Sequence, residues 1–199
     1  MNKNVEILET TTPFQGYFRI DRYSLRHSRY DGGQTQPMTR EIFERGHAAA
    51  VLLYDPLRDE VGLIEQFRVG AYAANWPDPW LIEIVAGIID DDAPADQVAI
   101  REAREEAGVD VRDLIRISKF LVTPGGSSET LELFCGRVDA TLLTGCHGLE
   151  EEGEDIRVFA LPAEEAFRWV EEGRVANATA IIALQWLALN RERVRALWR

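Results

Sequence analysis

Two glutamates near the middle of the chain have the type and spacing that metal-assisted chemistry requires. The segment 101–108 reads REAREEAG, and Glu102 and Glu106 stand four residues apart in it. On a helix this spacing places both carboxylates on one face, while Arg101 and Glu105 form the neighbouring pair. Like charges at this spacing destabilise an isolated helix by about 0.2 to 0.5 kcal/mol, so a compensating cation would explain them.

A second explanation is a solvated helix of mixed charge, in which Arg101 and Arg104 compensate the glutamates. The flanking sequence favours a bound cation, because a strand candidate ending in Ala86–Gly87 and an Asp-rich loop precede the helix. Carboxylates spaced along a helix face suit Mg²⁺ or Mn²⁺, which share their remaining sites with water and substrate phosphates. The pattern therefore predicts chemistry on phosphates.

The net charge of the chain narrows the choice of partners. Its 199 residues carry 22 Lys and Arg against 34 Asp and Glu, which gives a net charge of −12. Such a chain lacks the basic surface on which affinity for nucleic acids and anionic membranes depends, so we expect neither as a partner. No apolar run approaches the roughly 18 residues of a membrane span, and the N-terminal segment has no apolar signal region. We therefore expect a cytoplasmic protein.

The helix that must carry the glutamates is the clearest element in the sequence. Small and apolar residues recur at helical spacing between Ala95 and Ala107, which predicts a helix over this range. Asp92 is the expected N-cap, and Gly108 follows the expected end. A helix with these bounds would hold both glutamates in its second half.

Strands are expected on both sides of this helix. Residues 5–30, which include Tyr17 and Phe18, alternate loosely and predict strands with a hairpin turn at Asp31–Gly33. Further strands are predicted over 47–54, 60–68, 80–86, 114–122, 130–138 and 156–161, and further helices over 163–172 and 177–198. Because strands and helices come in runs rather than in strict alternation, the fold class is α+β.

The helix and the loop before it resemble the Nudix box. The segment is GIIDDDAPADQVAIREAREEAGV, residues 87–109, and the pattern is Gly-x5-Glu-x7-Arg-Glu-U-x-Glu-Glu-x-Gly-U, where U is a bulky apolar residue. The positions that match are Gly87, Arg101, Glu102, Glu105, Glu106, Gly108 and Val109. Two positions depart, because Ala93 stands at the first Glu and Ala103 at the first U. In the family the first Glu mainly helps to hold the loop to the box arginine, a role for which Asp91 and Asp92 are the candidates here.

Outside the box the chain resembles the bacterial ADP-ribose pyrophosphatase branch of this family over nearly its full length. The segments that carry the resemblance are REIFERGHAA (40–49), LIEQFR (63–68), WLIE (80–83), AG (86–87), PGGSSE (124–129), HGL (147–149) and EDIRV (154–158). The resemblance implies an α/β/α sandwich with a mixed sheet over residues 47–199. It also implies an N-terminal antiparallel β domain over residues 1–46, exchanged or packed across a homodimer.

The resemblance also assigns roles to individual residues. The metal ligands would be the carbonyl of Ala86 and the carboxylates of Glu102, Glu106 and Glu154, with Glu152 as the base that takes a proton from the attacking water. The substrate-binding residues would be Tyr17 and Phe18 beside the adenine, Arg40, Glu41, Arg45 and Arg68 on the ligand and its diphosphate, and Ile88, Thr123, Pro124, Gly125 and Glu129 along the rest. Because residues 150–155 read EEEGED, a shift of one residue would move the role of base to Glu151.

The activity that the resemblance implies is Mg²⁺-dependent hydrolysis of the diphosphate of ADP-ribose to AMP and ribose 5-phosphate, with Mn²⁺ as the alternative metal. Two other functions stay open at this point. One is hydrolysis of another nucleoside diphosphate sugar. The other is a catalytically weak sensor of nucleotide sugars, for which the missing Glu at position 93 is the motive. All the helix carboxylates that would bind metal are present, which favours an enzyme.

Overall fold

A computed structural model of the chain describes residues 3–90, 93–149, 151 and 153–198. The chain forms two compact units. The first combines Met1–His47 with Phe120–Leu131, and the second combines Ala48–Lys119 with Glu132–Arg199. The assignment of residues 1–46 to a dimerisation domain stays a prediction.

The first unit contains a three-stranded antiparallel sheet in the order β1 (Val5–Gln15), β2 (Arg19–His27) and β3 (Met38–Glu44). The prediction that Tyr17 and Phe18 lie on a strand is wrong. They lie in the tight connection between β1 and β2, where the N–H of Gly16 donates to the carbonyl of Phe18 at 2.8 Å. A single glycine without a second turn residue is a weak turn signal, so the sequence pattern predicts strand through Tyr17 and Phe18 and no turn.

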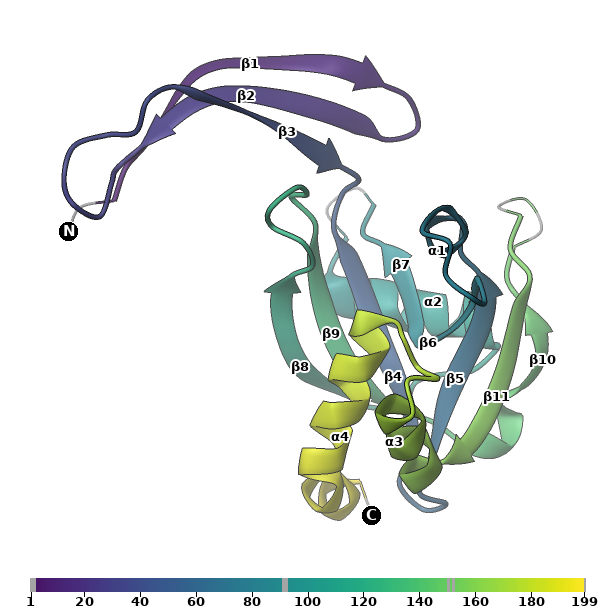
Figure 1. Cartoon of the computed structure of the whole chain (residues 1–199). Helices are drawn as coiled ribbons and strands as arrows, with labels where there is room; N and C mark the ends of the chain where they lie inside the picture. Colours follow the sequence, from purple (N-terminus) through teal and green to yellow (C-terminus); the bar gives the residue numbers. More distant parts are fainter. Residues whose placement is uncertain (1–2, 91–92, 150, 152, 199) are drawn as a thin grey trace. The chain divides into compact units, whose positions relative to one another are not determined.

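The second unit is built around an eight-stranded sheet (Figure 1). Its strands are β4 (Ala48–Asp55), β5 (Glu60–Phe67), β6 (Trp80–Glu83), β7 (Val85–Ile88), β8 (Leu114–Leu121), β9 (Thr130–Arg137), β10 (Thr144–His147) and β11 (Ile156–Pro162). The order is β10-β11-β5-β4-β9-β8, with β6 paired to β5 and β7 paired to β4. The strands β4 and β9 end at the same edge, because the N–H of Val138 donates to the carbonyl of Tyr54. The sheet is therefore mixed.

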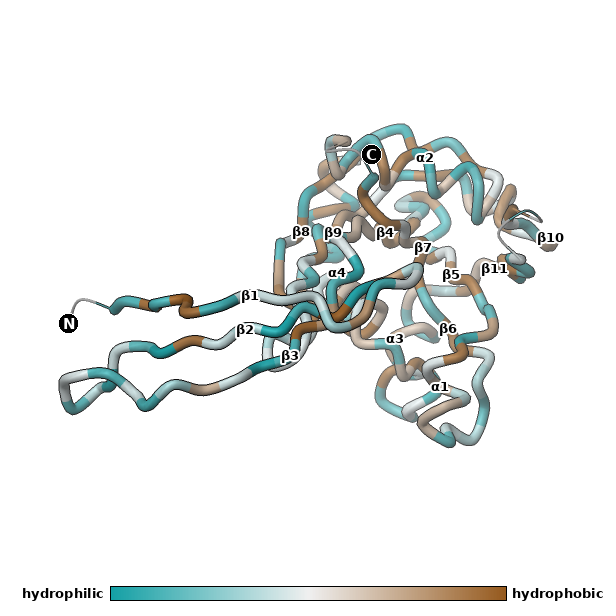
Figure 2. The backbone as a smooth tube through the Cα atoms, turned by 90° about the horizontal axis from the view of Figure 1, so that it is seen from above, coloured by the Kyte–Doolittle hydropathy of each residue, from teal (hydrophilic) through white to brown (hydrophobic). Residues whose placement is uncertain are grey.

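Helices cover both faces of this sheet. They are α1 (Val69–Ala73), α2 (Ala95–Ala107), the 3₁₀ turn η1 (Ala140–Leu142), α3 (Ala163–Glu171) and α4 (Ala178–Leu197). Figures 1 and 2 show α2 on one side of the sheet and α3 on the other, and α2 contacts β4 and β7 while α3 contacts β5 and β11. The α/β/α layering implied by the resemblance is thus confirmed. No helix in the described part of the chain is long and apolar enough to cross a membrane.

The helix that carries the paired glutamates begins and ends where the sequence predicts, at Ala95 and Ala107. Its N-cap is Pro94, which makes no side-chain capping hydrogen bond, so the prediction of Asp92 at this position is wrong. Asp92 itself lies outside the described residues. At the other end the C-cap residue Gly108 has a left-handed backbone, with φ of 66°.

One part of the core of the second unit lies between α2 and the sheet. All eight residues of β4 are buried, and the tube in Figure 2 is hydrophobic along this strand. The buried apolar residues of α2 are Val98, Ala99, Ala103 and Ala107. Since Ala103 is fully buried there, its departure from the Nudix pattern lets the helix approach the sheet with a small side chain. Ala93, at the other departure, packs against the same core.

A half-buried ion cluster joins the β4–β5 turn to α4, and it makes the stability of the fold sensitive to acid. Asp59 accepts a hydrogen bond from the hydroxyl of Tyr54 at 2.6 Å and from Arg191 Nε at 2.9 Å, and it is paired with Arg195 at 3.3 Å. The hydrogen bond from Arg191 holds the pKa of Asp59 below its usual 3.8, against the opposing effect of burial. A lowered pKa stabilises the fold above the unfolded value, and this contribution is lost as the pH falls through the folded one.

We expect Asp59→Asn to lower the free energy of unfolding at pH 7 by about 2 kcal/mol, because hydrogen bonds to a charged group are lost. Asn tolerates the left-handed backbone that Asp59 adopts, with φ of 60°, so the variant tests the charge alone. Urea unfolding at a series of pH values measures the effect. The difference from wild type should shrink as the pH falls below 3.8. A difference that does not change with pH would contradict the assignment, and Asp110→Asn, in an exposed pair with Arg104, is the control.

Candidate active site

The two glutamates of α2 point their carboxylates into the second unit rather than into solvent. Glu102 is 9% exposed and Glu106 is 3% exposed. The N–H of Ala86, in β7, donates to Glu106 Oε2 at 3.0 Å. Arg101 pairs with Glu102 at 2.9 Å and with Glu105 at 3.1 Å. Arg101, the arginine of the Nudix box, is thus held by ion pairs with glutamates of its own helix. The family's first glutamate, which would help to hold the loop to this arginine, is replaced by Ala93.

Burial makes the negative charge of these two carboxylates unfavourable. The pKa of Glu106 is raised to about 8, mainly by desolvation and also by the charges of Glu102 and Glu154, while the hydrogen bond from Ala86 and the charge of Arg68 oppose the rise. An oxygen-only set of carboxylates that repel one another is the donor set that hard divalent cations prefer. In the described ranges, no group of three or more His, Cys, Asp or Glu residues is placed to hold a metal ion, and the carboxylates of Glu106 and Glu154 accept hydrogen bonds from backbone N–H groups instead. Their chemistry fits a divalent cation.

Gly87 is required where β7 meets α2. A Cβ atom at this position would lie 2.0 Å from Oε1 and 2.6 Å from Cγ of Glu102. Such contacts are shorter than any that folded proteins contain, so any larger residue must displace the Glu102 side chain from its place. The glycine thereby sets the distance between the strand that carries Ala86 and the helix that carries the carboxylates.

If Glu102 is a metal ligand, as the resemblance implies, Gly87→Ala should weaken the binding of a divalent cation such as Mg²⁺ about 10- to 100-fold, the usual cost of disturbing the surroundings of a metal ligand. Titration calorimetry in the absence of substrate measures this affinity, and circular dichroism reports whether the fold survives. The matched control is Gly70→Ala in α1, where an added Cβ meets nothing within 4 Å. Equal Mg²⁺ affinity in the two folded variants would show that the position of Glu102 is not set by this contact.

A further buried carboxylate of the second unit, Glu83, has no role predicted from the sequence. Glu83, at the end of β6, is 4% exposed. It accepts hydrogen bonds from Arg68 at 2.8 Å, from Gln66 at 3.3 Å and from Asn177 at 2.7 Å. Glu83 therefore fixes the guanidinium of Arg68, which the resemblance assigns to the substrate diphosphate. The signals in the sequence are a charged residue at the end of an otherwise apolar strand and its place in the segment WLIE (80–83), which carries the resemblance.

The acidic loop after β10 brings Glu154 toward the helix carboxylates. Glu154 Oε2 accepts a hydrogen bond from the N–H of Leu149 at 3.0 Å. The predicted base, Glu152, lies outside the described residues. Its alternative, Glu151, is described but has no contact that identifies a base. The choice between them stays a prediction.

The first unit gathers a separate set of the predicted binding residues. Phe18 lies between Tyr17 and Phe43, with ring centroids 4.7 Å and 5.1 Å away. The guanidinium of Arg45 stands 5.7 Å from the Phe18 ring and pairs with Glu129 at 2.9 Å. An aromatic ring beside a paired arginine suits a planar, electron-rich group. Phe43, which completes the set, had no predicted role.

The remaining predicted residues divide between the two units. Arg40, Glu41, Thr123, Pro124 and Gly125 belong to the first unit with the aromatic set, whereas Arg68, Ala86, Ile88, Glu102, Glu106 and Glu154 belong to the second. Glu41 is paired with Arg22 at 2.8 Å, and Arg40 donates to the carbonyl of Thr39. Thr123 begins a turn by accepting hydrogen bonds from the N–H groups of Gly126 and Ser127. Each unit thus holds part of the predicted site.

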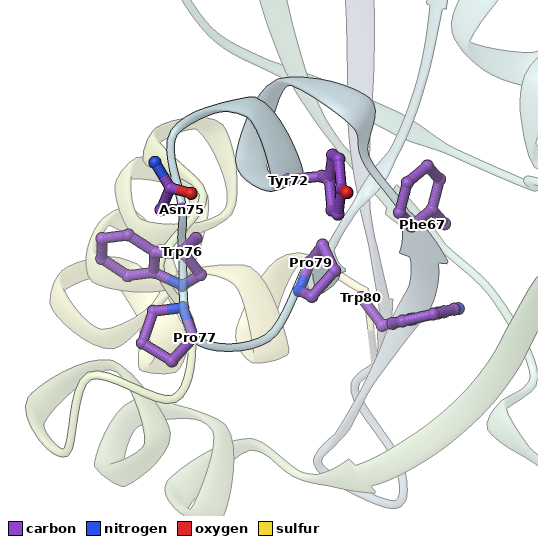
Figure 3. A pocket seen from close by; sticks show the side chains of 7 residues that line it. All are labelled: Phe67, Tyr72, Asn75, Trp76, Pro77, Pro79 and Trp80. Atoms are coloured by element: carbon purple, nitrogen blue, oxygen red, sulfur yellow. The ribbon is translucent and has the colours of Figure 1, made fainter.

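An aromatic pocket of about 510 Å³ lies next to Arg68 in the chain but has a different character (Figure 3). Its lining residues are Phe67, Tyr72, Asn75, Trp76, Pro77, Pro79 and Trp80. Phe67 and Trp80 face each other across β5 and β6, with ring centroids 5.3 Å apart. The lining includes no charged residue, so this pocket offers no ligand for a cation.

Comparisons with known proteins agree with this geometry. The model of the NUDIX domain matches residues 44–186. The chain is 47% identical to the ADP-ribose pyrophosphatase of Escherichia coli strain K12, over 98% of this chain and 93% of that protein. It is 36% identical to the GDP-mannose pyrophosphatase of Cronobacter sakazakii, over 95% of this chain and 97% of the relative.

A solved structure has the same fold. It is titled "Crystal structure of ADP compounds hydrolase", and it aligns with a TM-score of 0.71 over 96% of both chains at 19% identity. The family match covers more than half of the chain and includes the strand, the glycine and the helix that build the carboxylate site. The chain therefore belongs to the Nudix family.

Proposed function

We propose that this protein hydrolyses the diphosphate of ADP-ribose to AMP and ribose 5-phosphate with the help of Mg²⁺. The observation that carries the proposal is the pair of buried carboxylates on α2. One of them, Glu106, accepts a hydrogen bond from the N–H of Ala86 in β7. The names of the relatives support the substrate, because the ADP-ribose pyrophosphatases of Escherichia coli and Haemophilus influenzae are 47% and 40% identical to this chain.

In this proposal the cation is held by the Ala86 carbonyl and by Glu102, Glu106 and Glu154. When bound, Mg²⁺ would supply positive charge that neutralises the diphosphate oxygens, including the charge that develops on oxygen as one phosphorus is attacked. Without such a cation, the chain's own charge of −12 would oppose an anionic substrate. The donor set would bind Mn²⁺ by the same oxygen chemistry.

The protein's other residues bind the substrate and move one proton. Glu152 accepts the proton of the attacking water, which is general base catalysis. Arg68 binds the diphosphate, and its ion pair with Glu83 keeps the guanidinium in one orientation before substrate arrives. In the first unit, Phe18 and Tyr17 stack on the adenine while Arg45 and Glu129 bind polar groups of the ligand.

We infer that the protein works as a homodimer in the cytoplasm. The first unit has little core of its own, since only one residue in β1 is not exposed and Val5, Ile7, Leu8 and Phe14 are 45–59% exposed. A three-stranded sheet with exposed apolar side chains needs a partner surface for stability. A two-fold partner would provide that surface for both copies at once.

The experiment that tests the substrate is incubation of the protein and Mg²⁺ with a panel of nucleoside diphosphate derivatives. We expect AMP and ribose 5-phosphate from ADP-ribose at a higher kcat/KM than any other compound in the panel. GDP-mannose is the most informative competitor, because a GDP-mannose pyrophosphatase is 36% identical to this chain. Faster hydrolysis of GDP-mannose would replace the proposed substrate. Binding of ADP-ribose without hydrolysis of any compound would favour the sensor.

A further inference from the structure

The segment that follows β10 is tied to the C-terminal end of α2. The N–H of Gly148 donates to the carbonyl of Glu105 at 3.2 Å. Glu105 stands in the last turn of α2, where helix carbonyls lack partners inside the helix. The loop backbone therefore satisfies one of these carbonyls, and it does so next to the residue that precedes Glu106.

The ring of His147 lies directly against Gly108. A Cβ atom at position 108 would stand 2.5 Å from Cε1 and 2.9 Å from Nδ1 of that ring. Gly108 is thus required twice, once by its left-handed backbone and once by the close approach of the imidazole. A flat ring against a glycine at the helix C-cap fixes the distance between β10 and α2.

The orientation of this ring is set within β10. His147 Nε2 lies 2.9 Å from the carbonyl of Thr144, which accepts only, so Nε2 carries the proton and donates. This hydrogen bond holds the imidazole edge toward the strand. The ring is therefore fixed at two places, by the Thr144 carbonyl at Nε2 and by Gly108 at Cε1 and Nδ1.

The same loop closes on Glu154 by two reciprocal hydrogen bonds. The N–H of Leu149 donates to Glu154 Oε2 at 3.0 Å, and the N–H of Glu154 donates to the carbonyl of Leu149 at 3.2 Å. Leu149 stands two residues after His147. Gly148 and Leu149 therefore connect the histidine to the Glu154 carboxylate, whose charge acts on Glu106.

We propose that His147 is a positioning residue for the cation site, and that its ring against Gly108 sets where Glu154 stands relative to the glutamates of α2. The inference rests on the proposed function, in which Glu154 is a metal ligand. It extends that function, because the contacts of His147 are with Thr144 and Gly108 and the proposed function gives it no part in binding substrate or metal. Through the loop closure at Leu149, the imidazole holds the third carboxylate in reach of the pair.

The test is the affinity of the full-length protein for Mg²⁺ in the absence of substrate, measured by titration calorimetry on His147→Ala. We expect a loss of about 10-fold, as for other partners of metal ligands. His147→Phe retains a flat ring against Gly108 and should stay close to the wild-type affinity. The control is Cys146→Ala, one residue earlier in β10, where the side chain is exposed.

A residue with only a structural role would lower the thermal midpoint without changing the Mg²⁺ affinity of the folded protein. Equal affinity for Mg²⁺ in His147→Ala and Cys146→Ala would overturn the proposal, and so would a wild-type protein that binds no Mg²⁺. If His147→Ala fails to fold, a loss of affinity in His147→Asn that His147→Phe does not share gives the same answer. Hydrolysis of ADP-ribose is measured separately, so an inactive protein with the expected Mg²⁺ differences would refute the proposed function and leave this inference standing.

Discussion

Replacing Glu106 by glutamine is expected to lower the turnover of ADP-ribose more than about 100-fold, because loss of a ligand exceeds the 10- to 100-fold cost of losing a residue behind one. The amide keeps the volume of the side chain and can still accept the hydrogen bond from Ala86, which is 3.0 Å long in the native protein. The fold should therefore survive while the charge that holds the cation is gone. Steady-state kinetics at saturating Mg²⁺ measure the effect.

The same substitution should stabilise the protein when no cation is present. The folded pKa of Glu106 is about 8 and its ordinary value is 4.5. A group whose pKa is raised by folding contributes stability at low pH that is lost as the pH rises through the folded value. Glu106→Gln removes this loss, so its thermal midpoint in EDTA should exceed that of wild type, and the gain should be larger at pH 9 than at pH 6.

The matched control is Glu105→Gln, on the neighbouring face of α2. Its carboxylate pairs with Arg101 at 3.1 Å and is 29% exposed, so its removal should change neither turnover nor the pH dependence of stability appreciably. Near-native turnover of Glu106→Gln would show that this helix face is not the metal site. A lower midpoint in EDTA would show that burial of the charge is not what strains the site.

The parts of the fold that the sequence predicted best are those fixed by local chemistry. The bounds of α2 follow from apolar periodicity and from Gly108, and both signals lie within the helix or next to it. The single strand predicted over 80–86 is two strands instead, since β6 pairs with β5 and β7 pairs with β4. An apolar run in the sequence does not show at which residue the chain stops pairing with one strand and begins to pair with another. The strand β10 was not predicted, for a related reason. Its four residues form a strand by pairing with β11, which comes later in the chain.

For the site as well, the sequence predicts what depends on residues close together in the chain and not what depends on contacts between distant residues. The spacing of Glu102 and Glu106 put both on one helix face, and the Nudix pattern added the strand that ends at Gly87. The contacts of Glu83 were beyond reach, because Arg68 and Asn177 are 15 and 94 residues away along the chain. The contact between His147 and Gly108 was beyond reach as well. A residue that positions another is identified from its contacts in the folded protein. The spacing of residues in the sequence does not show these contacts.

Glu152→Gln is expected to lower the turnover of ADP-ribose by a factor of about 100 to 10,000, the usual contribution of a general base. Because a base acts on the attacking water in the transition state, ground-state binding of ADP-ribose and of Mg²⁺ should change little. The variant should therefore lose kcat while the Kd values for substrate and cation, measured by calorimetry, stay near those of wild type. This separation distinguishes Glu152 from Glu154, whose loss should weaken Mg²⁺ binding itself.

Glu151→Gln is the matched control, because it changes the same charge one residue away in the same acidic run. If Glu152 is the base, Glu151→Gln should be mild. Unchanged turnover in Glu152→Gln would mean that another carboxylate takes the proton, with Glu151, Glu154 and Glu129 as the next candidates in that order. Glu154 is restrained by its closure on Leu149, and Glu129 by its pair with Arg45 at 2.9 Å. A base must approach the attacking water, so a carboxylate already held by a protein partner is the poorer candidate, and that is why Glu151 comes before both.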